Sequence, residues 1–496
     1  MLGLFSAKPK HPLADAKEAR RIIEALETHK PAVIIDEVSI WLESLAGLDD
    51  IPASLRFRRI AELSAVAMPA SRRLGREFLA APQQEQKSWQ LIIIFWGRLK
   101  EALQRCLDEV DANPKARNAF KPEMNALLAA LLVAFHGHQR WIQFRYDALD
   151  GDQWAAMGKI YLDSQQEKFA ENQVKPFGDA EGTTSIRGEY LKLLVFHASS
   201  MGNLSPHEIS LAERFIAHFL PHFTLSIDPK GGTYWIDAGK PQPPMRLIHP
   251  PEASPGVSFI GLTQAVVAAR ELHGRITASQ TSPSGIDLGG QYPVATLLAV
   301  LDHLSACWSP QPPTRSFQRH RVASPMVASN GFASLHAILS GTNLGQAQAE
   351  SWQGEDVSQG GMSVRLPLSR NAQLQVGALV GCQPAGNGHW LIGVVRRFQR
   401  ESETQGTAGI ETLSKTPQGV TAIDSAMKTD LILLDPLRDD TSIRVLLKPC
   451  DWEDGPTMQL FIDGQPWRLH PDEKLEEGTD WLNARFIAES LDPDRR

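Results

Sequence analysis

The chain has 496 residues, 42% of them hydrophobic and 22% charged, which is typical of an ordinary soluble protein with three or four domains. Its formal net charge of −7 argues against general binding of DNA, RNA or acidic membranes, so an anion site must be a local basic cluster. The four cysteines form no CxxC pair, which argues against a disulfide framework or a structural zinc site and fits a reducing cytoplasm.

The sequence predicts neither a signal peptide nor a transmembrane segment. The strongest apolar run, residues 91–96, is flanked by Lys87 and Arg98 and is too short to cross a bilayer. The first five residues are apolar but too few for a signal peptide, and Pro12 follows soon after. We therefore expect a cytoplasmic protein.

Residues 1–222 are predicted to form an all-α region, either a helical bundle or a helical-repeat array. A helix is expected to begin after Ser205, which can cap it, with Pro206 in its first turn and Glu208 completing a capping box. Before it, apolar residues recur at three- and four-residue steps in residues 14–28, 31–48, 54–80, 86–110, 122–149 and 152–171.

Residues 223–314 are predicted to hold a β-hairpin, a proline-rich linker and two helices. The linker is indicated by six prolines between positions 241 and 255. A second proline run, from Pro310 to Pro313, then leads into a basic segment. The two hairpin strands are expected at residues 223–227 and 233–236, and the two helices at residues 262–272 and 293–308.

Beyond this region the pattern changes to short alternating strands with Gly and Asn turns. Residues 315–420 are predicted to form a small antiparallel β-barrel, and residues 421–496 a second small β-unit. A short helix at residues 330–339 is expected as an insertion in the first barrel. The fold class is thus multidomain α+β. Strands are expected at residues 362–366, 374–382, 390–398, 409–413, 430–434, 443–447, 458–462 and 467–469.

A basic arm opens the first β-region. Arg315 and Arg319 stand four positions apart, and Arg321 follows them. The planar fork of arginine donates in pairs to phosphate oxygens, matches the O6/N7 edge of guanine and stacks on flat rings. Such an arm is therefore suited to close over a nucleotide that lies on a rigid surface.

A polar turn follows 37 positions after Arg319 (356 − 319) and reads Asp-x-Ser-x-x-Gly, with Asp356, Ser358 and Gly361. It would present short polar groups and backbone N–H donors, while the glycine permits a positive φ or the close approach of a base. The gap leaves room for the predicted short helix.

Together the arm and the turn resemble the PilZ domain signature, Arg-x-x-x-Arg followed by Asp/Asn-x-Ser-x-x-Gly. PilZ domains are small β-barrels that bind the bacterial second messenger cyclic di-GMP. The resemblance covers about a fifth of the chain and implies a receptor without catalytic residues, metal or cofactor. It assigns phosphate and guanine contacts to the two spaced arginines and guanine hydrogen bonds to the polar turn. The resulting ligand-binding set is Arg315, Arg319, Arg321, Asp356, Ser358 and Gly361, with His320 as an auxiliary contact.

In the leading interpretation, cyclic di-GMP orders the arm, and the helical region responds by binding a protein partner. One alternative is a ligand-independent scaffold with a degenerate PilZ-like barrel. A third is an enzyme, but the chain has no nucleotide-phosphate loop, GxSxG elbow or HExxH motif. The nearest catalytic candidates, His303 and the acidic cluster Asp435, Asp439 and Asp440, are more simply a helix surface and a solvated loop.

Overall fold

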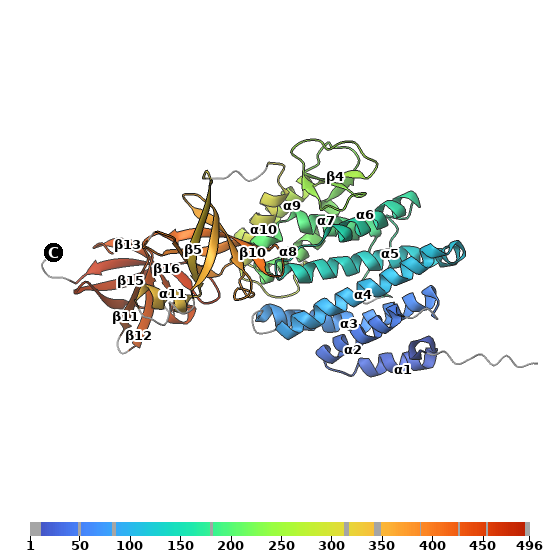
Figure 1. Ribbon diagram of the computed structural model, residues 1–496, viewed down its shortest axis with the longest axis horizontal. Helices are drawn as coiled ribbons and strands as arrows, with labels where there is room; N and C mark the ends of the chain where they lie inside the picture. The colour runs from blue at the N-terminus through green and yellow to red at the C-terminus, as the bar shows by residue number, and fades with distance from the viewer. Residues whose placement is uncertain are drawn as a thin grey trace, which may run out of the picture. The chain divides into compact units, whose positions relative to one another are not determined.

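The computed structural model describes residues 11–47, 51–81, 86–178, 182–311, 317–341, 349–386, 388–424, 427–452 and 455–491. The chain divides into two compact units (Figure 1). The helical unit comprises residues 1–201 and 206–313, and the barrel unit comprises residues 202–205 and 314–496. Within the described ranges, no helix is both long and apolar enough to cross a membrane.

Long helices build the first part of the helical unit, and α2 to α5 lie side by side (Figure 1). Side-chain caps define several of their starts, because Asp15, Asn113, Asp150 and Ser185 each accept hydrogen bonds from first-turn N–H groups. The helices are α1 (Ala16–Leu26), α2 (Pro31–Ala46), α3 (Ala53–Ala80), α4 (Gln86–Ala112), α5 (Pro114–Gln143), α6 (Gly151–Gln166), α7 (Ile186–Ala198) and α8 (Pro206–Phe219).

Two of these helices differ from the sequence prediction. The helix expected over residues 122–149 begins already at Pro114, because Asn113 caps it there, and Pro122 lies inside it. The α7 helix was not predicted as a separate element. Nine of its thirteen residues are buried, so it lacks the polar face that makes a helix periodic in sequence.

A four-stranded sheet follows, with strands β1 (Thr224–Ser226), β2 (Tyr234–Asp237), β3 (Met245–Arg246) and β4 (Val257–Gly261) in the order β1-β4-β2-β3. The predicted hairpin is therefore wrong, because β4 lies between β1 and β2 and pairs with both. The physical reason is burial: four of the five β4 residues are buried and take the central position. The two helices predicted after the sheet are confirmed as α9 (Thr263–Ser279) and α10 (Val294–Trp308).

The barrel unit begins with a closed antiparallel barrel in the order β10-β7-β6-β5-β8-β9. Its strands are β5 (His320–Asn330), β6 (Glu350–Val357), β7 (Gly361–Pro367), β8 (Leu379–Pro384), β9 (Leu391–Arg400) and β10 (Gln405–Ser414). The strand expected at residues 374–382 starts only at Leu379. Gly377 has a φ of 87° and makes a turn, in which its N–H donates to the carbonyl of Val395 at 2.8 Å.

The C-terminal β-unit is a second closed barrel, in the order β11-β12-β13-β16-β15-β14. Its first strand begins at Gln418, so residues 418–420 belong to this barrel rather than to the first. Its strands are β11 (Gln418–Asp424), β12 (Met427–Leu433), β13 (Thr441–Leu447), β14 (Met458–Ile462), β15 (Gln465–Glu477) and β16 (Leu482–Ser490). The multidomain α+β class, with helices followed by antiparallel barrels, is confirmed.

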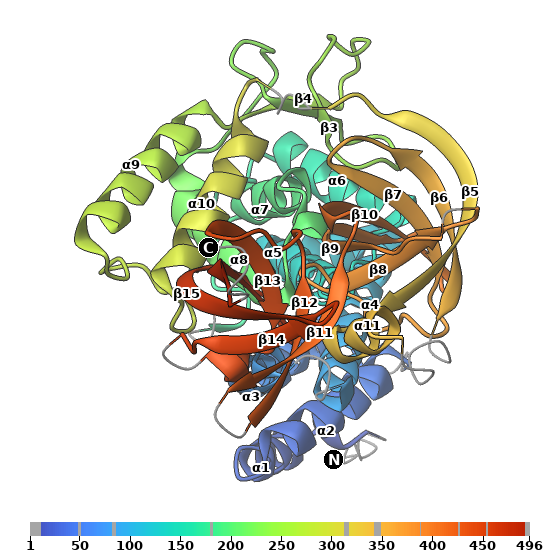
Figure 2. The same cartoon turned by 90° about the vertical axis from the view of Figure 1, so that its left-hand side faces the viewer.

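The predicted short helix is α11 (Phe332–Leu339), which lies beside β8 and β11 (Figure 2). Phe332 and Leu335 are buried in one apolar cluster with residues of both barrels, among them Ile392 from the first and Ile432 from the second. The helix starts where the N–H of Phe332 donates to Asp480 Oδ2 at 2.7 Å. The inserted segment is therefore part of the core that joins the two barrels.

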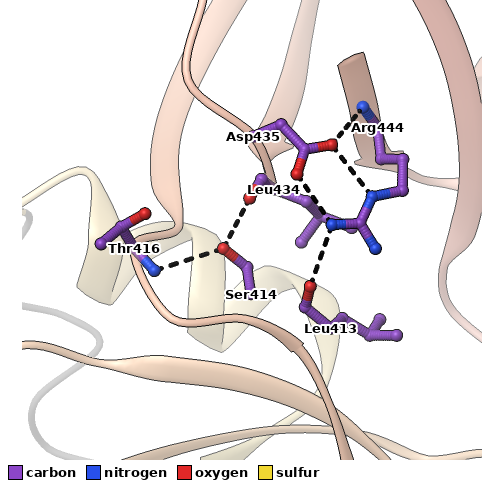
Figure 3. A network of polar contacts seen from close by, with 6 residues as sticks. All are labelled: Leu413, Ser414, Thr416, Leu434, Asp435 and Arg444. Carbon is purple, nitrogen blue, oxygen red and sulfur yellow. Dashed lines mark hydrogen bonds and ion pairs between the residues drawn. The ribbon is translucent and has the colours of Figure 1, made fainter. Parts of the chain in front are cut away.

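A polar network also joins the barrels (Figure 3). The guanidinium of Arg444 makes two hydrogen bonds to Asp435, at 2.7 and 2.9 Å, and its backbone N–H makes a third at 2.9 Å. Nη2 also donates to the carbonyl of Leu413 at 3.2 Å. Ser414 Oγ donates to the carbonyl of Leu434 at 2.6 Å. The hydrogen bonds from Arg444 lower the pKa of Asp435. The ion pair therefore ties the end of β10 to the second barrel.

Acidification should remove the contribution of this ion pair. Because the folded pKa of Asp435 lies below its ordinary value of 3.8, the stabilisation is complete above about pH 4 and is lost as the pH falls through the folded pKa. We expect Asp435→Asn to destabilise the barrel unit by roughly 1 kcal/mol at pH 7. Urea unfolding curves should show that the difference in free energy of unfolding between the wild type and Asp435→Asn shrinks steadily below pH 4. Asp472→Asn, at an exposed position of β15, serves as the control, and a deficit that is constant with pH would contradict the assignment.

Candidate ligand-binding site

The two predicted motifs meet in the first barrel. Strands β5 and β6 pair so that Arg321 lies opposite Asp356 and His320 opposite Val357. Arg319 directly precedes β5, and its Nη1 donates to Asp356 Oδ2 at 3.1 Å. Strand pairing thus brings together two residues that are 37 positions apart in the chain (356 − 319), and the segment with α11 loops out between them.

A groove of about 760 Å³ opens beside this contact. This volume lies within the range of about 300–1,000 Å³ that is usual for small-molecule sites. Strands β6, β7, β9 and β10 contribute most of its walls. The lining includes Phe317, Arg319, Asp356, Ser358, Gly361, Arg396, Arg397, Gln399 and Glu411.

The Asp-x-Ser-x-x-Gly segment forms the tight connection between β6 and β7. The backbone N–H and the hydroxyl of Ser358 both donate to the carbonyl of Gly361, at 2.7 and 3.1 Å. A Cβ at Gly361 would lie 2.2 Å from the carbonyl oxygen of Ile410, and φ at Gly361 is outside the left-handed region. The glycine therefore permits the close approach of β10, rather than the positive φ considered from the sequence.

The carboxylate of Asp356 is only half satisfied. Its Oδ2 accepts from Arg319, whereas its Oδ1 is buried and has no hydrogen-bond partner among the described residues. A buried acceptor without a partner is costly, by about 1–3 kcal/mol. Asp356, which lines the groove, thus has one carboxylate oxygen that no described donor satisfies.

Comparison with known families identifies this barrel. Residues 345–418, which include β6 to β10 and the Asp-x-Ser-x-x-Gly turn, match the family described as the middle PilZ domain of the cyclic-di-GMP receptor FimW. The first barrel is therefore a PilZ domain. Residues 17–230 match the family described as the N-terminal domain of the same receptor. No curated protein and no solved structure matches the chain.

Four of the six predicted ligand-binding residues line the PilZ groove: Arg319, Asp356, Ser358 and Gly361. Arg321 is exposed on β5, opposite Asp356, and is not part of the groove lining. Arg315 lies outside the described residues. The structure therefore brings the core of both motifs together, and the ligand-binding roles of all six residues stay predictions.

Sequence reasoning missed two arginines of the PilZ groove, Arg396 and Arg397 on β9. Neighbouring strand residues normally point to opposite faces. Here the register with β10 shifts between Gly409, which faces Arg397, and Ile410, which faces Val395. Arg396 is the extra residue of this β-bulge, and a bulge re-aims side chains. Only the strand register could reveal this pair.

The two arginines differ in their partners. Arg396 is ion-paired with Glu411 at 2.6 Å and with Glu476 of the second barrel at 2.8 Å, and these hydrogen bonds raise its pKa. Arg397 is exposed and donates to Gln399 Oε1 at 3.4 Å. Within the described part of the chain, Arg397 has no carboxylate partner, so it is a cation that a ligand can use.

Most carboxylates of the PilZ groove are already neutralised. Glu355 and Glu401 each lie near Arg365, at 2.7 and 3.4 Å, and Glu411 is held by Arg396. Phe317 contributes an apolar surface. Its ring packs over Gly360, where an added Cβ would lie 3.0 Å from the ring. The groove thus combines a half-exposed aromatic ring, one unpaired acceptor and arginines near its rim.

The structure gives no support to the catalytic candidates of the sequence. Nε2 of His303 lies 2.7 Å from the carbonyl of Ser199, and Asp435 binds Arg444. Asp439 accepts from the backbone N–H of Ser490 at 2.7 Å. Among the described residues, no group of three or more His, Cys, Asp or Glu side chains could hold a metal ion. The matching families are described as receptors rather than enzymes.

Proposed function

We propose that this protein is a receptor for cyclic di-GMP, which binds in the PilZ groove. The observation that carries the proposal is the meeting of Arg319 and Asp356 at a groove in a barrel of the PilZ family. Both matching families are described as parts of a cyclic-di-GMP receptor, which supports the same ligand.

Each part of the ligand has a counterpart in the PilZ groove. The fork of Arg319 suits a phosphate or the O6/N7 edge of a guanine. The unpaired Oδ1 of Asp356 can accept from the N–H groups on the opposite edge of that guanine. Arg397 offers a further cation for the second phosphate, and Phe317 a ring for stacking. Ser358 contributes mainly by holding the turn that places Asp356.

The arm would supply the remaining positive charge. The carboxylates of the groove leave little net charge for two phosphates, so Arg315 and Arg321 would complete the site when the arm closes. Cyclic di-GMP binds the closed arm better than the open one, and this difference in affinity shifts the population. Residues 309–314 join α10 to the arm in the chain, so closure can be transmitted to the helical unit.

The helical unit would then bind a protein partner in response. Its match to the N-terminal domain of the same receptor supports a joint function of the two units. We also infer that the protein acts in the cytoplasm, where this messenger is found. All four cysteines are free, as expected in a reducing compartment.

Calorimetric scanning of the full chain with cyclic di-GMP or GTP tests the proposal. At a hundredfold excess over Kd, a ligand of the native state adds about 2.7 kcal/mol. For a unit the size of the two barrels, this corresponds to a rise in Tm of roughly 5–10 °C. GTP carries guanine and phosphates but lacks the cyclic arrangement, so it should shift Tm far less. Equal shifts, or none, would leave the ligand-independent scaffold as the better function.

A further inference from the structure

A second cavity lies within the helical unit, among α3, α4, α5, α7 and α8, and has no part in the PilZ groove. Its volume is about 240 Å³, which is below the range of about 300–1,000 Å³ for drug-sized ligands. A small ligand therefore fits it better than a dinucleotide does. The polar residues that matter for its chemistry are Arg72, Trp96, His136, Arg140, Glu189, Lys192, Glu213 and Arg214.

The lining holds four Arg or Lys residues and two Glu residues, and each of the four cations has a partner. Arg140 Nη1 donates to Glu213 Oε2 at 2.7 Å, and Lys192 binds Glu189 at 2.8 Å. Burial alone would raise the pKa of Glu213, but the nearby Arg140, His136 and Arg214 lower it to about 2. Arg214 also lies 3.6 Å from Asp287, which holds part of its charge.

Three residues of the lining carry a buried nitrogen without a hydrogen-bond partner in the described part of the chain, and one of these, His136 Nε2, lies 3.9 Å from Glu213 Oε1. Among the described residues, Trp96 Nε1, Arg140 Nε and His136 Nε2 have no hydrogen-bond partner. Trp96 and His136 are only 6% and 9% exposed. The first two atoms can only donate, and Nε2 of a neutral histidine donates in one of its two tautomers. Three such atoms around one cavity are unusual, because buried polar groups are nearly always paired.

The position of Trp96 is set by close packing. A Cβ on Gly137 would lie 2.4 Å from its indole ring, so α4 and α5 approach each other here as only a glycine allows. His136 on the same turn of α5 packs edge-on against Phe196 of α7. These contacts hold both rings against the cavity but leave Trp96 Nε1 and His136 Nε2 without a hydrogen-bond partner among the described residues. The donor set is therefore built into the packing of the unit.

We propose that this cavity binds a small oxyanion, such as a phosphate or the carboxylate of a small molecule. The oxygens of the anion accept hydrogen bonds from Trp96 Nε1, Arg140 Nε and His136 Nε2. A neutral ligand of the same size would make weaker hydrogen bonds with these donors. The helical unit thus has a ligand site of its own, independent of the PilZ groove.

Isothermal titration of inorganic phosphate, and separately of acetate, into the full chain at constant ionic strength tests this proposal. We expect saturable binding that Trp96→Phe weakens by roughly 10-fold or more, because this change deletes one N–H donor to a charged acceptor and keeps the ring. Binding of phosphate but not acetate would indicate a phosphate site. Binding of both anions would indicate that the cavity also accepts a carboxylate. The absence of saturable binding of either anion would overturn the proposal.

Two controls locate the binding. Trp89→Phe on the same helix removes an N–H that donates to the carbonyl of Trp141 at 2.8 Å, outside the cavity, and should leave anion binding unchanged. Arg319→Ala removes a cation of the PilZ groove and should also have no effect. If either control weakens binding as much as Trp96→Phe does, the anion is not in this cavity.

A second variant covers the case in which Trp96→Phe disturbs folding. Arg140→Gln alone would leave Glu213 buried without its partner, so the double change Arg140→Gln/Glu213→Gln replaces both charged side chains by neutral ones. It removes the Nε donor together with one positive and one negative charge of the lining. Phosphate affinity should fall by at least 10-fold. An unchanged affinity in a folded double variant would contradict the site.

Discussion

Arg319→Ala should weaken the binding of cyclic di-GMP by roughly 30- to 1,000-fold, which corresponds to about 2–4 kcal/mol. The guanidinium lies 3.1 Å from Asp356 at the PilZ groove and is the arm residue that the structure places there. Its removal deletes the fork for the ligand and leaves the carboxylate of Asp356 without a cation. Isothermal titration of the wild type and the variant measures the effect, with GTP as the control nucleotide.

A matched control is Arg468→Ala in the second barrel. Arg468 also lies 3.1 Å from a carboxylate, that of Glu489, and its side chain is 34% exposed, against 46% for Arg319. It should change affinity by less than about 2-fold, because ion pairs near the surface contribute little and this one is not part of the groove lining. Arg397→Ala should weaken binding more than this control does. Equal effects of Arg319→Ala and Arg468→Ala would remove Arg319 from the site.

Gly361→Ala should have the largest effect on stability. Its Cβ would lie 2.2 Å from the backbone oxygen of Ile410, so β10 would have to move, and a backbone atom cannot rotate away. We expect a loss on the order of 3 kcal/mol for the barrel unit, the upper part of the range for overpacking. For a unit of this size, Tm falls by roughly 6–12 °C, which differential scanning calorimetry of the full chain resolves.

Gly409→Ala on β10 is the control for this prediction. A Cβ there would lie 3.4 Å from Cβ of Arg397, an ordinary contact, so Tm should change by less than about 3 °C. Gly361→Ala should also lower affinity for cyclic di-GMP, but only together with the loss of stability. A stable Gly361→Ala variant that no longer binds would instead favour direct approach of the ligand to this glycine.

The local sequence predicted much of the fold and part of the candidate site. The periodicity of the long helices predicted α1 to α4 within a few residues, because each has a polar and an apolar side. It failed for α7, which is buried on most sides. Strand prediction likewise failed at the β1–β2 hairpin, because the partner of a strand depends on which segment is most buried.

The PilZ motifs could be predicted from the sequence because their chemistry depends on residues that are close together in the chain. Arginine spacing and the Asp-x-Ser-x-x-Gly turn require particular residue types at short distances, and the turn residues line the groove. The presence of Arg396 and Arg397 in the groove could not be predicted, because it depends on a register shift between β9 and β10. The donors Trp96, His136 and Arg140 were also missed, since α4 and α5 bring them together only through helix packing.

The sequence by itself therefore determined the α+β class, the PilZ resemblance, and the residue types of the arm and turn. Each of these depends on neighbours within a few positions, where propensity and spacing act directly. The tertiary structure alone decided that the inserted helix α11 joins two barrels, that a bulge adds two arginines to the groove, and that a polar cavity lies among the helices. These features arise from contacts between distant segments, whose pairing is set by burial and register across the whole unit.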